Sequence, residues 1–81
     1  MMNIKYSAHA VDRMLQRKIT TSQVERILND PDGMIHQSKD KIIFYKILKE
    51  RKDNALAAVT VSREVDTYEV VTVMINFEVN K

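Results

Sequence analysis

The sequence predicts an α+β domain in which a short N-terminal strand and two packed helices precede a four-stranded antiparallel sheet. Two observations predict this class. Apolar residues recur every three or four positions up to residue 30, as in amphipathic helices, and about every second position after Gly33, as in strands. The later segments are joined by connections too short for a parallel crossover, which favours antiparallel pairing. With 81 residues, the chain is expected to form a single domain, 1–81, with one core.

The helical half follows a short strand predicted over residues 3–6. Ser7 is expected to cap the first helix, because its hydroxyl can accept a hydrogen bond from the first turn. The apolar arc predicted for this helix comprises Ala10, Val11, Met14 and Leu15. The opposite arc carries His9, Asp12, Arg13, Gln16 and Arg17.

The second helix carries clearer end signals. Thr20 and Gln23 have the spacing of a capping box, and Ile19 and Val24 occupy the positions of a hydrophobic staple. The predicted buried stripe comprises Val24, Ile27 and Leu28. A turn over residues 29–33, which contains the only proline and the only glycine of the chain, is expected to end the helix.

Four strands are expected over residues 34–37, 41–49, 55–62 and 67–76. The second of them is apolar on both faces, with Ile42, Phe44 and Leu48 on one and Ile43, Tyr45 and Ile47 on the other. We therefore expect both faces of the sheet to be at least partly buried. A partner chain could cover the second face, which is consistent with a homodimer.

Composition excludes several classes of site and location. The chain has no cysteine, so it has neither disulfides nor a thiolate metal site, and its single glycine excludes a glycine-rich phosphate loop. With only two histidines, no metal site and no cofactor is expected. The sequence shows neither a signal segment nor an apolar run of about 20 residues, which predicts a cytoplasmic protein without a membrane partner.

Positive charge is concentrated in two blocks although the net charge is only +2. Residues 1–20 carry four bases and one acid, and residues 41–63 carry six bases and two acids. If the fold brings the two blocks together, they form a surface suited to phosphate groups. The alternative interpretation is that these lysines and arginines are simply solvated.

The chemistry predicted for the first helix depends on His9, Arg13 and Arg17. Their spacing of i, i+4 and i+8 places all three on one helical face. An imidazole can act as a general acid or base near neutral pH, and guanidinium groups bind phosphate through paired hydrogen bonds. This combination favours cleavage of RNA without a metal ion. The alternative is a solvated face in which Asp12 or Glu25 pairs with the arginines.

Further contacts to RNA are predicted from the sheet. Lys46, Lys49 and Arg63 could add positive charge, and Thr60 and Thr72 could offer hydroxyl groups if their face of the sheet is open. The run 49–52 is equally consistent with a solvated hairpin loop.

The helical pattern resembles a known family. The residues are Ser7-x-His9-Ala10-x-x-Arg13-Met14-x-x-Arg17-x-Ile19, followed by Val24, Leu28-x-x-Pro31 and the strand 70–73. Together they are similar to a family of small uncharacterised bacterial proteins grouped with the RelE/ParE-like toxins of the barnase–colicin–RelE ribonuclease fold. The resemblance covers nearly the whole chain. The helical signature is its specific part.

The resemblance implies a RelE-like toxin domain that cleaves RNA and is neutralised by a cognate antitoxin. The sequence departs from many such nucleases at its C-terminal end, where residues 76–81 contain no Tyr, His or Arg. Any catalysis would then depend on the first helix and on basic residues of the sheet. Two alternatives remain open: a non-catalytic module that binds nucleic acid or protein, and a ParE-like inhibitor of a topoisomerase.

Overall fold

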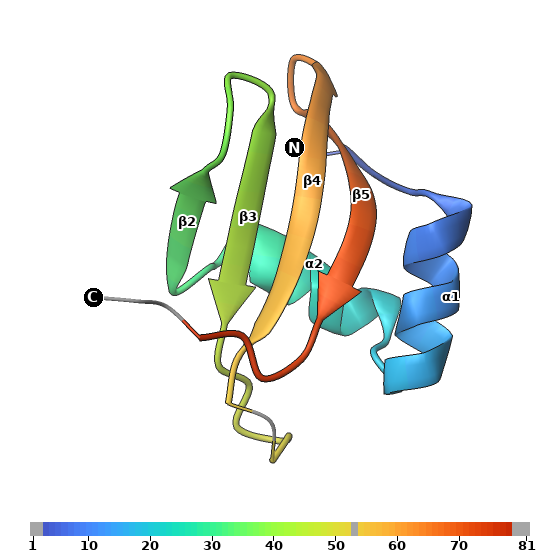
Figure 1. Ribbon diagram of the computed structural model, residues 1–81, viewed down its shortest axis with the longest axis vertical. Helices are drawn as coiled ribbons and strands as arrows, with labels where there is room; N and C mark the ends of the chain where they lie inside the picture. Colours follow the sequence, from blue (N-terminus) through green and yellow to red (C-terminus); the bar gives the residue numbers. More distant parts are fainter. Residues whose placement is uncertain (1–2, 53, 79–81) are drawn as a thin grey trace.

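The computed structural model describes residues 3–52 and 54–78, without the side chain of Arg63. In chain order the elements are β1 (Asn3–Tyr6), α1 (Ala8–Arg17), α2 (Thr21–Asn29), β2 (Gly33–His36), β3 (Lys41–Lys46), β4 (Leu56–Glu64) and β5 (Thr67–Met74). The helix α2 lies behind one face of a single five-stranded sheet, and α1 lies beside the sheet next to β5 (Figure 1). The strand order across the sheet is β1-β5-β4-β3-β2. The predicted α+β class is confirmed.

The expected four-stranded antiparallel sheet is wrong in one respect. β1 joins the sheet beside β5 and runs parallel to it, so the sheet has five strands and is mixed. Backbone hydrogen bonds are formed at both ends of this β1–β5 pairing. Asn3 N–H donates to the Asp66 carbonyl, and Ser7 N–H donates to the Val70 carbonyl. Turn lengths could not reveal this pairing, because it joins segments that lie more than 60 residues apart.

Ser7 connects the start of α1 to an irregularity in β5. Its Oγ accepts a hydrogen bond from Ala10 N–H at 3.0 Å, as predicted for an N-cap, and donates one to the Val71 carbonyl at 3.1 Å. At this point the β4–β5 register passes from Thr60↔Val70 to Val59↔Thr72, which leaves Val71 as the extra residue of a β-bulge. One hydroxyl group thus holds the helix start against the bulge.

Replacing Ser7 by alanine is therefore expected to destabilise the protein by about 1–2 kcal/mol, because both hydrogen bonds of the hydroxyl are lost. Thr20→Ala is the matched control, since it removes only a helix cap and should cost about 1 kcal/mol. Denaturant unfolding of the two variants measures the difference. Equal losses would show that the bond from Ser7 to β5 contributes nothing.

The first helix buries a narrower stripe than its sequence predicts. Ala10 and Met14 are buried, but Val11 is 44% exposed and Leu15 is 74% exposed, although both belong to the predicted apolar arc. Figure 1 shows α1 beside the sheet edge, where it packs against β5. One strand edge offers less covering surface than a sheet face, so only the residues nearest β5 are enclosed.

The second helix matches its predictions closely. Thr20 Oγ1 accepts from Gln23 N–H at 3.1 Å, and Gln23 Oε1 accepts from Thr20 N–H at 3.0 Å, which completes the capping box. Ile19 and Val24, the two staple residues, are both buried. The predicted stripe packs in the core, with Val24, Ile27 and Leu28 at most 2% exposed.

Each face of the sheet carries its own apolar cluster. The helix-covered face includes Ile42, Phe44, Leu48, Leu56, Ala58, Val70 and Val73. The opposite face, called the outer face below, centres on Ile43, Ala57 and Val59, and partly buried Ile35, Tyr45, Val71, Met74 and Phe77 pack around them. The expected partial burial of both faces is confirmed. Whether a second chain covers the outer face stays a prediction.

The strand β3 ends at Lys46, three residues before its predicted end. Ile47 N–H donates to the Asp32 carboxylate at 2.8 Å instead of continuing a ladder, and the Ile47 side chain is 62% exposed rather than packed on the sheet. The turn after α2 supplies this carboxylate. The loop after β3 consequently begins at Ile47, earlier than the sequence indicates.

Candidate functional site

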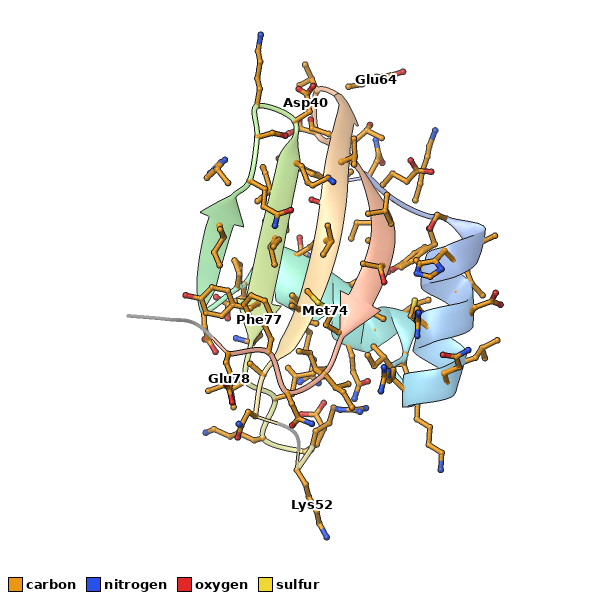
Figure 2. The ribbon with its side chains drawn as sticks, in the orientation of Figure 1. Asp40, Lys52, Glu64, Met74, Phe77 and Glu78 are labelled. Atoms are coloured by element: carbon orange, nitrogen blue, oxygen red, sulfur yellow. The ribbon has the colours of Figure 1, made fainter. Side chains whose placement is uncertain are left out.

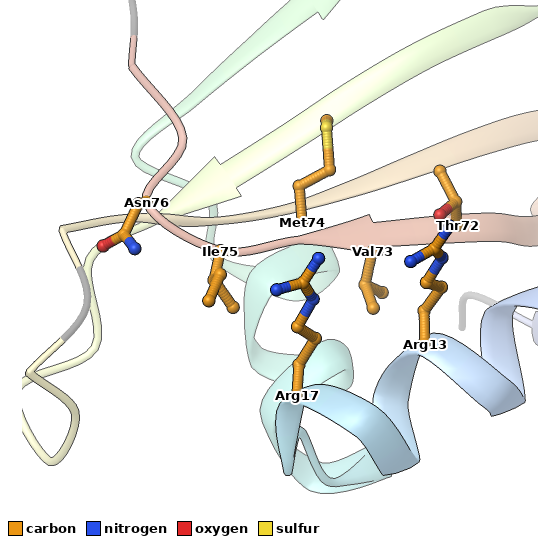
Figure 3. A pocket seen from close by; sticks show the side chains of 7 residues that line it. All are labelled: Arg13, Arg17, Thr72, Val73, Met74, Ile75 and Asn76. Atoms are coloured by element: carbon orange, nitrogen blue, oxygen red, sulfur yellow. The ribbon is translucent and has the colours of Figure 1, made fainter.

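An open groove of about 570 Å³ lies between α1 and the end of β5 (Figure 3). Its lining residues are Arg13, Arg17, Thr72, Val73, Met74, Ile75 and Asn76. Three of the residues proposed from sequence, Arg13, Arg17 and Thr72, are therefore brought together. They come from two elements more than 50 residues apart in the chain.

The partial pairing of β5 creates this groove. β1 pairs with β5 only from Thr67 to Val70, so beyond that point the edge of β5 faces α1 instead of another strand. The bulge at Val71 shifts the register by one residue and places Thr72 opposite Val59, a residue of the outer-face cluster. Figure 3 shows both guanidinium groups extending from α1 toward β5, with Arg13 nearest Thr72.

The groove is positively charged, and in the described part of the chain neither arginine pairs with a carboxylate. Arg13 donates only to neutral groups, from Nε to His9 Nε2 and from a terminal nitrogen to Gln16 Oε1, each at 3.4 Å. The three ion pairs seen in residues 3–52 and 54–78 involve Arg26 and Lys46 instead. Both guanidinium groups are thus available to an anion, and no described acidic residue lines the groove.

His9 lies next to the groove rather than in its lining. It is exposed in the first turn of α1, and its Nε2 accepts the hydrogen bond from Arg13. An imidazole nitrogen with a free lone pair can accept a proton and so act as a general base. At 3.4 Å the bond is long and exposed, and a substrate hydroxyl could replace Arg13 as its donor.

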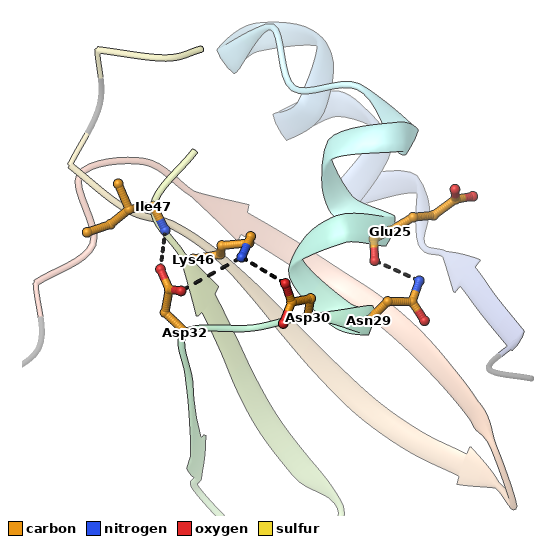
Figure 4. A network of polar contacts seen from close by, with 6 residues as sticks. All are labelled: Glu25, Asn29, Asp30, Asp32, Lys46 and Ile47. Carbon is orange, nitrogen blue, oxygen red and sulfur yellow. Dashed lines mark hydrogen bonds and ion pairs between the residues drawn. The ribbon is translucent and has the colours of Figure 1, made fainter. Parts of the chain in front are cut away.

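Two of the basic residues proposed from the sheet, Lys46 and Lys49, do not join this groove. Lys46 Nζ lies 3.4 Å from Asp30 Oδ2 and 3.7 Å from Asp32 Oδ1, so the turn after α2 neutralises its charge (Figure 4). Lys49 is exposed in the loop after β3, and it does not line the groove. The side chain of Arg63 lies outside the described residues.

Two threonines proposed as hydroxyl donors have different surroundings. Thr60 is fully buried, and its Oγ1 donates to the Ile42 carbonyl at 2.9 Å, so it cannot reach a substrate. Thr72 is partly exposed and lines the groove. Side chains alternate between the two faces of a sheet along each strand, and a bulge changes that alternation. The sequence does not reveal the bulge at Val71, so it could not predict on which face Thr72 lies.

Residues 51 and 54, which follow β3, supply contacts that the sequence did not indicate. Arg51 donates to the carbonyls of Lys18 at 2.8 Å and Arg17 at 3.0 Å, and it thereby caps the C-terminal end of α1. Asn54 N–H donates to Asn76 Oδ1 at 3.2 Å, which ties the loop to the end of the groove. Arg51 lies in a run of charged residues, 49–52, and no local sequence pattern indicates that this residue caps the helix.

Tyr6, just before this helix, is partly buried, and its hydroxyl oxygen is enclosed. Burial raises the pKa of its hydroxyl, and the nearby Glu25 carboxylate raises it further. Within the described residues this buried oxygen has no hydrogen-bond partner. The raised pKa keeps this phenol neutral at neutral pH, and its ring packs against the core beneath the helices.

The described ranges contain neither a cluster of metal ligands nor a membrane-spanning helix. Among residues 3–52 and 54–78, no three His, Asp or Glu side chains gather in a way that could hold a metal ion. Across the same residues, neither helix is long and apolar enough to cross a membrane.

Comparison with known proteins yields a family without an assigned activity. A family model described as a domain of unknown function (DUF4258) matches residues 6–75. This range contains both helices and the whole of β5. No curated protein and no solved structure matches the chain.

Proposed function

The chain belongs to the DUF4258 family of domains of unknown function, and we propose that it is a toxin of a toxin–antitoxin pair that cleaves RNA without a metal ion. The observation that carries this proposal is the pair of arginines, Arg13 and Arg17, that face one groove with no carboxylate partner among the described residues. The resemblance of the helical signature to RelE-like toxins supports the same function.

Substrate binding would use the phosphate group of the RNA. Each guanidinium can donate two parallel hydrogen bonds to phosphate oxygens, and together the two cations more than balance the single negative charge of a phosphodiester. Thr72 and Asn76 add uncharged donors at the β5 side of the groove. Because no described acidic residue lines the groove, a polyanion meets no repulsion there.

Cleavage would use the 2′-hydroxyl of the RNA as nucleophile. His9 Nε2 takes the hydroxyl proton, O2′ attacks phosphorus, and the bond from phosphorus to O5′ breaks. Arg13 stabilises the negative charge that develops on the phosphate oxygens. The leaving O5′ takes a proton from solvent, so the products are a 2′,3′-cyclic phosphate and a free 5′-hydroxyl.

A proteinaceous inhibitor fits this proposal. The groove is an exposed basic surface, and a cognate antitoxin with acidic side chains could cover it and exclude RNA. Such a pair would act in the cytoplasm, where the RNA substrate lies.

The proposal is tested with purified protein and a labelled single-stranded RNA in the presence of EDTA. We expect fragments that end in 2′,3′-cyclic phosphate, and no cutting of DNA of the same sequence, because DNA lacks the 2′-hydroxyl. If the RNA stays intact both with and without ribosomes, the proposed nuclease activity is contradicted.

One observation favours a second candidate function, an RNA-binding module without catalysis. His9 lies outside the groove lining, so binding by Arg13 and Arg17 does not require it. Salt-sensitive RNA binding without any cleavage product would support this function. Inhibition of DNA supercoiling by a topoisomerase, with RNA neither bound nor cut, would indicate the ParE-like alternative instead.

A further inference from the structure

The outer face of the sheet continues directly from the basic groove. The helix α2 lies behind the other face, and the outer face is turned toward the viewer in Figure 1. Met74 belongs to both regions, because it lines the groove and also packs in the outer-face cluster. Figure 2 shows Met74 and Phe77 close together on this near side of the sheet.

Phe77 is held in place on this face although it follows the last strand. Its N–H donates to the Ala55 carbonyl at 2.9 Å, which directs the chain back across the sheet. Its ring centroid lies 5.7 Å from that of Tyr45, with 35° between the ring planes. Both side chains are only partly buried, so the pair presents an aromatic surface beside Met74.

A basic groove next to a partly exposed apolar and aromatic surface matches a particular kind of polyanion. Single-stranded nucleic acid carries phosphates along one side and exposes flat base faces along the other, whereas the bases of a duplex are enclosed by stacking. An aromatic side chain can stack on any base, and guanidinium groups beside it can bind the phosphates. The two kinds of group together can therefore contact both parts of such a strand at once.

We propose that the substrate is single-stranded RNA whose phosphate binds at Arg13 and Arg17 while an adjacent base stacks on Phe77 beside Met74. This inference rests on the proposed function, because it assumes that the groove binds a nucleic-acid phosphate. It names the class of RNA and assigns Phe77 a binding role.

The test uses a single-stranded 2′-O-methyl oligouridine, which cannot be cleaved, and a strand of the same length without bases. Phe77→Leu keeps an apolar side chain in the outer-face cluster but removes the ring. We expect it to weaken binding of the oligouridine by about 5- to 100-fold. Binding of the base-free strand should stay within about twofold, and Phe77→Trp should retain affinity.

The chain contains no tryptophan, so Phe77→Trp also supplies a selective fluorescent reporter. Stacking of a base on the indole should quench its emission on titration with the oligouridine and leave it unchanged with the base-free strand. This readout separates a direct contact from a structural effect. Thermal unfolding of Phe77→Leu verifies that the variant is folded under the binding conditions.

Any one of four results would overturn the inference. Equal affinity of the wild type for both strands would exclude base stacking, and so would an unquenched indole in the bound complex. Preference for an acidic peptide over the oligouridine would make this surface a protein interface. If Phe77→Leu has no effect while the arginine variants weaken binding, only this inference fails; if the arginine variants bind normally, the proposed function fails too.

Discussion

Replacing His9 by alanine is expected to lower the rate of RNA cleavage by about 10²–10⁴-fold, the usual contribution of a positioned acid or base. His9 is the described imidazole that adjoins the groove, and its Nε2 accepts from Arg13 at 3.4 Å. Because His9 does not line the groove, the affinity for a non-cleavable RNA should change by less than about threefold. Single-turnover cleavage and fluorescence anisotropy measure the two effects separately.

The second histidine provides the matched control for this experiment. His36 ends β2, the strand at the opposite edge of the sheet from β1, so His36→Ala should leave the cleavage rate unchanged. In bacteria, induced wild-type protein should arrest growth with loss of RNA, while His9→Ala should not. Cleavage at the wild-type rate by a folded His9→Ala protein would remove His9 from the mechanism and favour the second candidate function.

Replacing Arg13 and Arg17 together by alanine is expected to weaken RNA binding by about 100-fold at low salt, about tenfold for each guanidinium. Neither side chain pairs with a carboxylate in the described structure, so the substitutions leave no described carboxylate without its ion-pair partner. The slope of log affinity against log salt should fall by about 0.7, because the one phosphate bound by the two arginines is no longer neutralised. Anisotropy titrations at several salt concentrations provide this slope.

Two controls separate specific contacts from net charge. Lys39→Ala combined with Lys41→Ala removes the same charge from the β2–β3 turn and the start of β3, and it should weaken binding by less than about threefold. Arg13→Lys with Arg17→Lys keeps the charge but loses the paired hydrogen bonds, so its affinity should be intermediate. If both double-alanine variants weaken binding equally, the groove has no special role.

Several features of the protein could be predicted because they depend on neighbours within about four residues. The Ser7 cap, the Thr20–Gln23 capping box and the buried stripe of α2 all agree with the structure. The alignment of His9 and Arg13 on one helical face also follows from helical spacing, and their hydrogen bond is consistent with it. Local sequence is sufficient here because these contacts form within one helical turn.

Pairings between distant segments decided the rest of the site. The parallel pairing of β1 with β5 ends at Val70, and this leaves the strand edge beside which the groove forms. The bulge at Val71, the capping of α1 by Arg51 and the return of Phe77 across the outer face each join residues that no periodic pattern relates. The same holds for the pairing of Lys46 with Asp30 and Asp32.

The sequence thus determined which chemical groups the first helix presents, because helix geometry alone orders them. Only the tertiary structure decided which of those groups face a groove, since that depends on how far β1 covers β5 and on which cations meet a carboxylate elsewhere. Arg13 and Arg17 remain available because no described acidic residue lines the groove between α1 and β5 or pairs with them. Lys46, equally basic in the sequence, is neutralised by a turn that folds back to it.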